Sequence, residues 1–269
     1  MALLNYIILI PCILSSLSCS IFLYFYIKYD SIRYTFGMKH VAILQSADLL
    51  VSLTDIFIRG LISINYTQCN VEGFASTFFC LFQTMWVALI VRYTYQVLYL
   101  KIDKERISIL KPLIFVIGFS MANSILPVSL GCFNVENSEC IFHCDKWIQI
   151  SLICMQLFSI AFSFIISLYM NLLLIKKLRI YLKTRSNEMK WTFIRLSVYP
   201  FITIVCLIPT FVLFTYKLSN KSESSFLDLS SFICYNLIGF LNSVALGFTP
   251  EFREAIRFHR RQKTIPLIN

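Results

Sequence analysis

Two aspartates and an arginine interrupt the apolar run 41–63 at helical spacing. Asp48, Asp55 and Arg59 lie seven and then four residues apart, and Ser52 falls between the two aspartates. Residues three or four apart share one face of a helix, so we expect these side chains on a single face turned into a bundle. An ionisable group inside an apolar segment is expensive and marks a candidate functional site. Arg59 lies near the end of the run, where it can reach the interface or pair with Asp55.

Polar residues in two other apolar runs can complete this group. Arg92 lies at a depth similar to that of Asp48, which is about 12 Å from the end of its helix at ~1.5 Å per residue. We predict that Asp48 and Arg92 face each other or share a polar network; an ion pair that serves packing alone is the alternative. Asn242, followed by Ser243, is a candidate hydrogen-bond partner of Asp48. Such bonds average roughly 0.6 kcal/mol in membranes, so they orient helices more than they hold them together.

The remaining polar residues predict no catalysis, metal site or cofactor. His40, His143 and His259 fall outside the apolar runs, without a second ligand at metal-binding spacing. The sequence has no Gly-rich phosphate loop and no nucleophile elbow. His143 lies between Cys140 and Cys144, where we expect an oxidised loop in preference to a metal site. The chain is therefore expected not to be an enzyme.

Seven apolar runs must position these residues. Of the 269 residues, 58% are hydrophobic and 14% are charged, against roughly 45–50% and 25% in soluble domains. We expect an all-α membrane protein, a seven-transmembrane helix bundle over 1–249, with a tail over 250–269. The first run lacks a basic leader and exceeds the apolar core of a signal peptide, so it is kept as a span. The predicted spans are about 3–27, 41–63, 77–100, 112–130, 148–175, 195–216 and 226–248.

Loop charges predict the orientation of the bundle. Loops one, three and five and the tail are basic, whereas the opposite loops hold only Lys146, Lys217 and Lys221. Basic loops face the cytosol, which places the N-terminus outside. The net charge of +10 then reflects loops that face anionic lipid and protein partners, so no nucleic acid partner is expected. A multi-pass protein of the plasma membrane is predicted.

Sequons and cysteines agree with this orientation. Asn65 and Asn220 each begin an Asn-x-Ser/Thr sequon in a loop predicted to lie outside, so both are candidate glycosylation sites. Five cysteines lie on or beside the same side, where disulfides persist. We predict a disulfide between Cys80 and Cys140, with Cys132 and Cys144 as close competitors. Cys69 could close a second bridge, and spacing alone does not fix the connectivity.

The segment after the last span resembles a short interfacial helix. Pro250 suits a helix start, and Glu251 and Glu254 suit its positive end. Apolar residues share one face, and arginines lie around the others. We therefore expect an amphipathic helix on the inner leaflet, with a disordered basic tail as the alternative.

The sixth run contains two prolines, Pro200 and Pro209. A proline inside a helix removes a hydrogen bond and clashes with the preceding turn. Membrane helices tolerate this defect, because neighbouring helices can satisfy the freed carbonyls. We predict that the sixth span is able to bend at these positions, next to a basic loop.

Several short motifs resemble the cyclic-AMP-receptor-like group of G-protein-coupled receptors, with more distant similarity to secretin-type receptors. Ser46-Ala47-Asp48-Leu49-Leu50 is similar to that group's Ala-Asp element in span two. Tyr199-Pro200 followed by Cys206-Leu207-Ile208-Pro209 resembles its span-six pattern, with Leu207 in place of tryptophan. Gly239-Phe240-Leu241-Asn242-Ser243 and Gly247-Phe248 resemble its span-seven run. Few outer basic residues could hold a cyclic phosphate, so no ligand is assigned.

The resemblance implies a receptor that passes an extracellular ligand signal to a heterotrimeric G protein. The unknown ligand would enter among spans three, five, six and seven, and span six would swing at Pro200 or Pro209. A seven-span transporter or channel is the alternative, which would need a continuous polar path. The Gα subunit would contact the third inner loop and its flanks, at Lys176, Lys177, Arg179, Lys183, Arg185 and Arg195.

Overall fold

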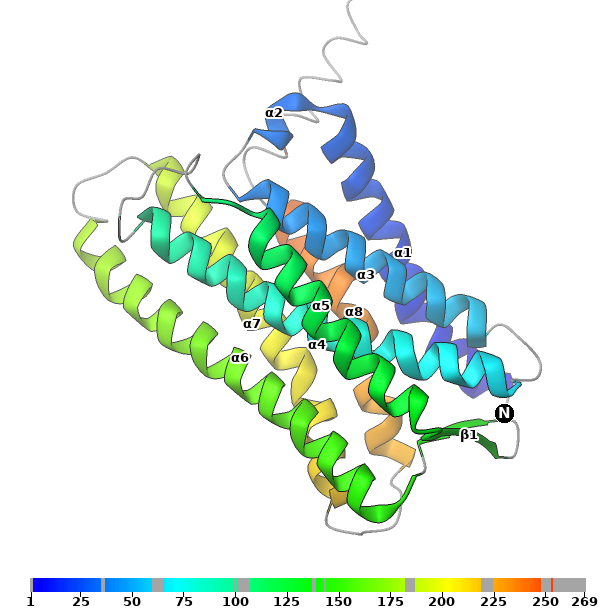
Figure 1. Ribbon diagram of the computed structural model, residues 1–269. Helices are drawn as coiled ribbons and strands as arrows, with labels where there is room; N and C mark the ends of the chain where they lie inside the picture. Colours follow the sequence, from blue (N-terminus) through cyan, green and yellow to red (C-terminus); the bar gives the residue numbers. More distant parts are fainter. Residues whose placement is uncertain are drawn as a thin grey trace, which may run out of the picture.

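The computed structural model is a bundle of long helices with one short β-hairpin (Figure 1). It describes residues 2–34, 37–59, 65–98, 100, 107–136, 139–142, 144–181, 187–218, 225–247 and 253. The elements are α1 (Ala2–Lys28), α2 (Asp30–Arg33), α3 (Met38–Arg59), α4 (Tyr66–Leu98), α5 (Leu110–Ser129), β1 (Phe133–Glu136), β2 (Glu139–Phe142), α6 (Lys146–Tyr181), α7 (Asn187–Leu218) and α8 (Ser225–Gly247). Successive long helices run in opposite directions through the bundle.

Six of these helices are long and apolar enough to cross a membrane: α1, α3, α4, α5, α6 and α8. The apolar segment of α7 within the described residues is Val198–Leu213, which is shorter than the ~20 residues of an ordinary span. α7 as a whole is nevertheless 32 residues long and packs against α4, α6 and α8. The prediction of a helical, multi-pass membrane protein is confirmed, while the count of seven spans, which needs α7 to cross as well, and the direction of the N-terminus stay predictions.

The main core lies between α1, α3 and α4. Trp86 of α4 is fully buried there, and its indole Nε1 donates a 2.8 Å hydrogen bond to the carbonyl of His40. His40 belongs to α3 and is buried against Trp86 and Tyr93, so its assignment outside the apolar runs is wrong. Tyr199 of α7 and Leu246 of α8 reach the same core. Ile32 of α2 and Val116 of α5 belong to it as well, so the core ties seven helices together.

α4 begins eleven residues earlier than the predicted span 77–100. Asn65 caps it, because the Asn65 Oδ1 accepts a 2.8 Å hydrogen bond from the backbone N–H of Gln68. Gln68 Oε1 in turn accepts from the backbone N–H of Asn65 at 2.8 Å. This reciprocal pair is a capping box, a strong signal for a helix start. The exposed sequon at Asn65 thus opens a helix and does not lie in the middle of a loop.

Because α4 starts early, Cys140 pairs with a different cysteine from the one predicted. Cys69, in the first turns of α4, is bonded to Cys140 of β2, with Cα atoms 5.2 Å apart. The predicted Cys80–Cys140 bond is wrong, since Cys80 lies eleven residues further along α4, about 16 Å into the bundle. The two competitors, Cys132 and Cys144, are free thiols. One of the named alternatives, Cys69, is therefore the partner.

The hairpin packs directly on α4. β1 and β2 are antiparallel and pair Phe133 with Phe142. The Phe133 ring covers Gly73 so closely that a Cβ at that glycine would overlap it. Gly131, with a φ of 66°, turns the chain from α5 into β1, a backbone conformation that favours glycine. The disulfide and this contact fix the hairpin over one end of the bundle, here called the hairpin end.

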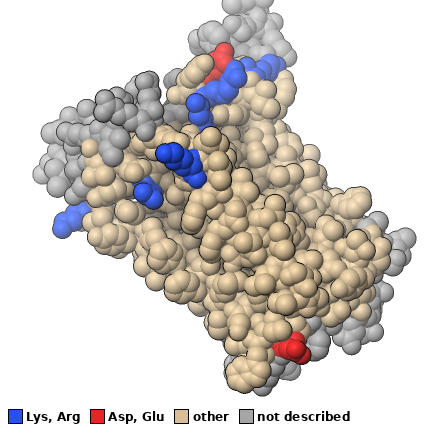
Figure 2. All heavy atoms as spheres, viewed as in Figure 1, with Lys and Arg blue, Asp and Glu red and all other residues tan. Residues whose placement is uncertain are grey.

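Exposed cations gather at the opposite end, here called the basic end. Lys28 ends α1, Lys39 begins α3, and both Lys111 at the start of α5 and Lys176 in the last turns of α6 are exposed. Figure 2 shows Lys and Arg side chains over this end of the visible face, with a long stretch of uncharged surface beside them. Arg33 also forms an ion pair with Asp30 in α2. The two ends thus differ in charge, as the loop pattern predicted.

Several predicted features lie outside the described residues. These are the second sequon at Asn220, the loop residues Lys183 and Arg185, and the interfacial helix after Pro250, of which Arg253 alone is described.

Candidate functional site

The carboxylate of Asp48 lies at a junction of α3, α4 and α8. Gln83 Nε2 donates a 2.6 Å hydrogen bond to Asp48 Oδ1, and Asn242 Nδ2 donates a 3.3 Å hydrogen bond to Oδ2. All three side chains are at most 2% exposed. A buried carboxylate is costly unless its oxygens accept hydrogen bonds, and here each oxygen has an amide donor. The expected bond between Asn242 and Asp48 is present, and Gln83 is the partner that sequence reasoning missed.

α1 packs against this junction, where α8 approaches both α1 and α3 closely. A Cβ at Gly239 of α8 would overlap Ser15 Oγ and lie 2.8 Å from Asp48 Cβ and 2.9 Å from Cys19 Sγ. Real Cβ atoms do not come so close to such neighbours, so only glycine lets α8 settle against α1 and α3 here. Gly239 therefore holds Asn242, one turn further along α8, within reach of Asp48.

A third hydrogen bond extends the junction toward the basic end. Ser243 Oγ donates to Gln45 Oε1 at 2.7 Å, linking α8 to α3 again. Gln45 lies one turn before Asp48, and its side chain is fully buried. Asp48, Gln83, Asn242, Ser243 and Gln45 are called the polar junction below.

Arg92 does not join the polar junction. Arg92 is exposed on α4, while both oxygens of Asp48 are held by amides, so the predicted Asp48–Arg92 arrangement is wrong. The side chain of Arg59 lies outside the described residues. Asp55 is 9% exposed and lies seven residues further along α3, toward the hairpin end. Helical spacing placed Asp55 on the correct face but could not choose the partners across the bundle.

A cavity of about 280 Å³ lies between α4, α6, α7 and α8 in the half of the bundle nearest the hairpin. These four helices are the spans three, five, six and seven among which a ligand was predicted to enter. Polar groups from all four line the cavity, including Thr77, Gln156, Thr210 and Asp228. Leu81, Ile160 and Phe232 supply apolar surface. A small ligand with both polar and apolar parts fits such a lining.

One interhelical hydrogen bond crosses the edge of this cavity. The hydroxyls of Thr210 on α7 and Ser231 on α8 lie 2.8 Å apart. Thr210 directly follows Pro209, and Pro209 and Pro200 both lie inside the continuous helix α7. Pro209 has no N–H, so the carbonyl of Val205 lacks its usual helical partner. A weak point of α7 therefore adjoins the hydroxyl pair that ties α7 to α8.

A small apolar cluster connects the cavity to the polar junction. Cys206 and Leu207 of α7 pack with Ile238 of α8, and Cys80 and Tyr235 from the cavity wall lie against them. Ile238 precedes Gly239 in α8. A shift of α7 at the cavity would therefore press on the helix segment that carries the junction.

The residues predicted to contact a G protein flank the start of α7. Lys176 is exposed near the end of α6. Lys177, Arg179 and Arg195 lie in α6 and α7, but their side chains are outside the described residues, as are Lys183 and Arg185 altogether. α6 ends and α7 begins at the basic end (Figure 1).

The Cys144 thiol beside the hairpin has low reactivity. Burial raises the pKa of Cys144 to about 12, and the neighbouring thiol of Cys132 adds to the shift. A thiol with so high a pKa stays protonated at neutral pH, so it is a poor nucleophile and metal ligand. Among the described residues, no three His, Cys, Asp or Glu side chains gather as a metal site.

Comparisons with protein-family models and with curated proteins find no match for this chain.

Proposed function

We propose that this chain is a seven-span receptor of the plasma membrane that passes an extracellular ligand signal to a heterotrimeric G protein. The observation that carries the proposal is the cavity between α4, α6, α7 and α8. It opens in the half of the bundle opposite the basic end, and the apolar cluster around Leu207 and Ile238 leads from it to the polar junction. In this proposal α7 also crosses the membrane, as the sixth of seven spans, and the N-terminus lies outside.

The proposed switch is a movement of α7. A ligand would bind between Gln156, Thr210 and Asp228, and it would favour a state in which α7 bends at Pro209. A ligand shifts such an equilibrium only by its difference in affinity for the two states. The basic segment from Lys176 to Arg195 would then receive the Gα subunit at the other end of α7.

Nucleotide exchange in reconstituted vesicles tests this proposal. We expect the purified chain to speed the binding of a labelled, non-hydrolysable GTP analogue to Gα in a panel of heterotrimers. Replacing Lys183, Arg185 and Arg195 with Gln should lower that rate. The matched control replaces Lys28, Arg33 and Lys39, three cations at the same end but away from α6 and α7, and should keep it.

The same vesicles report on the alternative. Ion or small-solute flux without nucleotide exchange would contradict the receptor proposal and favour a transporter or channel. Equal rates of nucleotide exchange in the two triple variants would contradict the proposed Gα contact at the start of α7.

A further inference from the structure

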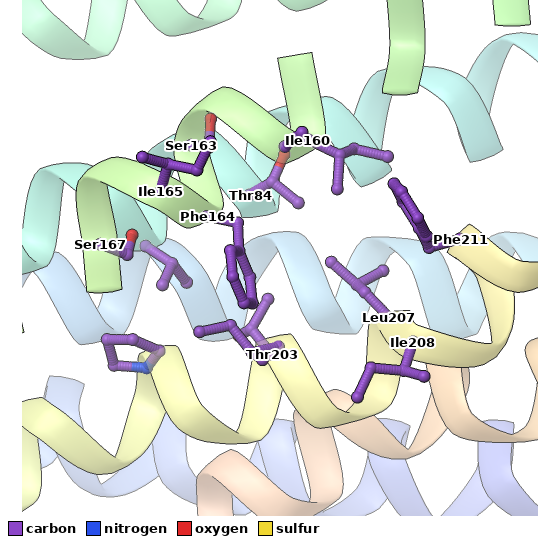
Figure 3. Close-up of a pocket in the computed structure, with 14 residues that line it drawn as sticks. Thr84, Ile160, Ser163, Phe164, Ile165, Ser167, Thr203, Leu207, Ile208 and Phe211 are labelled. Atoms are coloured by element: carbon purple, nitrogen blue, oxygen red, sulfur yellow. The ribbon is translucent and has the colours of Figure 1, made fainter. Parts of the chain in front are cut away.

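A second cavity, separate from the one at the hairpin end, opens between α6 and α7. Its volume is about 340 Å³, within the range of ligand pockets. It is lined by α4, α6 and α7, and Figure 3 shows Phe164 of α6 pointing across it toward Thr203 of α7. Ile165 and Ile208 at its rim are 62% and 55% exposed on the lateral surface of the bundle. The cavity therefore opens sideways, toward the lipid.

The lining excludes charged ligands. It contains no Asp, Glu, Lys or Arg, and its polar atoms are hydroxyls. An unpaired charge within an apolar segment is expensive, so an ionic head group would not enter. The occupant must be neutral and mostly hydrocarbon.

One of the lining hydroxyls lacks a partner. Thr203 Oγ1 is buried without a hydrogen bond, and the residue is 3% exposed. Other threonines in these helices donate to the carbonyl four residues back, as Thr84 does to Cys80 at 2.9 Å and Thr94 does to Ile90 at 2.8 Å. A buried hydroxyl left unpaired is destabilising, so Thr203 is set to bond with a group that enters the cavity.

The shape of the site favours a rigid occupant. Pro200 lies near one end of the cavity and Phe211 near the other, about 16 Å apart along α7. Thr203 lies eight residues into the predicted span 195–216, about 12 Å from the end of that span nearest the basic end. A rigid ring system loses less conformational entropy on binding than a flexible acyl chain does.

We propose that the cavity between α6 and α7 binds a sterol-type lipid, which enters from the bilayer and hydrogen-bonds through its single hydroxyl to Thr203. Its rings lie along α7 between Phe164 and Ile208, toward Phe211. The bound lipid wedges α6 from α7 beside Pro200. Leu207 lines this cavity and also belongs to the apolar cluster beside the cavity at the hairpin end. A lipid in the lateral cavity would therefore affect the position of α7. Binding itself does not depend on the proposed G-protein coupling.

Photolabelling tests the site directly. The full chain is reconstituted in phosphatidylcholine vesicles with a photoreactive, clickable cholesterol analogue, irradiated and digested, and labelled peptides are identified by mass spectrometry. We expect label to concentrate in peptides that cover 160–167 and 200–211. A tenfold excess of unlabelled cholesterol should lower it at least fivefold.

Three variants sharpen the result. Thr203→Val keeps the shape of the side chain and should weaken labelling severalfold, and Ala161→Phe should fill the cavity and abolish it. Thr215→Val is the matched control, because Thr215 lies on α7 outside the cavity and its hydroxyl bonds to the carbonyls of Phe211 and Val212. Circular dichroism and gel filtration check that each variant is folded.

Other outcomes would overturn the proposal. Label spread evenly over all lipid-facing helices, or unchanged by both Thr203→Val and cholesterol, would show ordinary annular lipid. Competition by oleic acid equal to that by cholesterol would show an acyl-chain groove in place of a sterol site.

Discussion

The α1–α3–α8 side of the bundle and its α6–α7 side differ in how closely the helices approach. On the first side, Gly239 lets α8 touch α1 and α3, and amides hold Asp48. On the second side, a cavity of about 340 Å³ separates α6 from α7, and α7 contains two prolines. Packed cores resist small displacements, whereas a void and a proline permit them. The looser α6–α7 side supports the proposal that α7 is the helix that moves.

The largest effect is expected at Gly239. Gly239→Ala should lower the free energy of unfolding by about 2–3 kcal/mol, because the added methyl overlaps Ser15 and crowds Asp48. Thermal unfolding of the detergent-solubilised chain measures this loss. Gly247→Ala in the same helix is the control, since no atom lies within 4 Å of its added Cβ. Equal losses in the two variants would contradict a close approach at Gly239.

Removing the acceptor of the polar junction comes next. Asp48→Ala leaves the amides of Gln83 and Asn242 without their acceptor and should destabilise by about 2 kcal/mol. Asp48→Asn keeps one carbonyl acceptor and should lose less. The same unfolding assay ranks the variants. A stability loss in Asp48→Asn as large as in Asp48→Ala would mean that the amides do not depend on this acceptor.

Two alanine-to-leucine changes compare the sides directly. Ala47 of α3 is 5% exposed within the main core, and Leu there should cost about 1–2 kcal/mol by overpacking. Ala161 of α6 borders the lateral cavity, which can accept the added atoms, so Leu there should change stability by less than about 0.5 kcal/mol. Urea or thermal unfolding in detergent measures both. A reversed order would show that the α6–α7 side is the tighter one.

The smallest effect is expected at the α7–α8 hydroxyl pair. Thr210→Val removes its hydrogen bond to Ser231 and should lower stability by about 0.6 kcal/mol, the average for such bonds between membrane helices. The double variant with Ser231→Ala should lose little more, because both changes remove one interaction. Strict additivity of the two losses, in a double-mutant cycle, would show that the hydroxyls do not interact.

The long helices could be predicted from the sequence because the apolar composition of a segment is enough to mark a membrane-length helix. Apolar runs of membrane length marked each long helix, and the sparse cations marked one end. The start of α4 was misplaced, since the segment before residue 77 is polar enough to resemble a loop. The capping pair of Asn65 and Gln68 was the signal that could have corrected it. With α4 extended, Cys69 in place of Cys80 would have been next to the outer loop.

The partners of Asp48 were only half predictable. Helical spacing shows which residues share a face of one helix, and Asn242 was found because it is polar within an apolar run. Gln83 was overlooked in favour of the charged Arg92, although an amide is cheaper to bury than a guanidinium. The two cavities could not be predicted, because they depend on how far apart the helices pack.

The Cys69–Cys140 bond spans 71 residues of sequence. One of its ends precedes most of α4 and the other follows α5, so both helices must be threaded before the two sulfurs can meet. Closure of this bond during synthesis would thus record that the third and fourth long helices have been inserted. A chain caught with Cys69 still reactive to alkylating reagents would be one whose biogenesis had stopped partway.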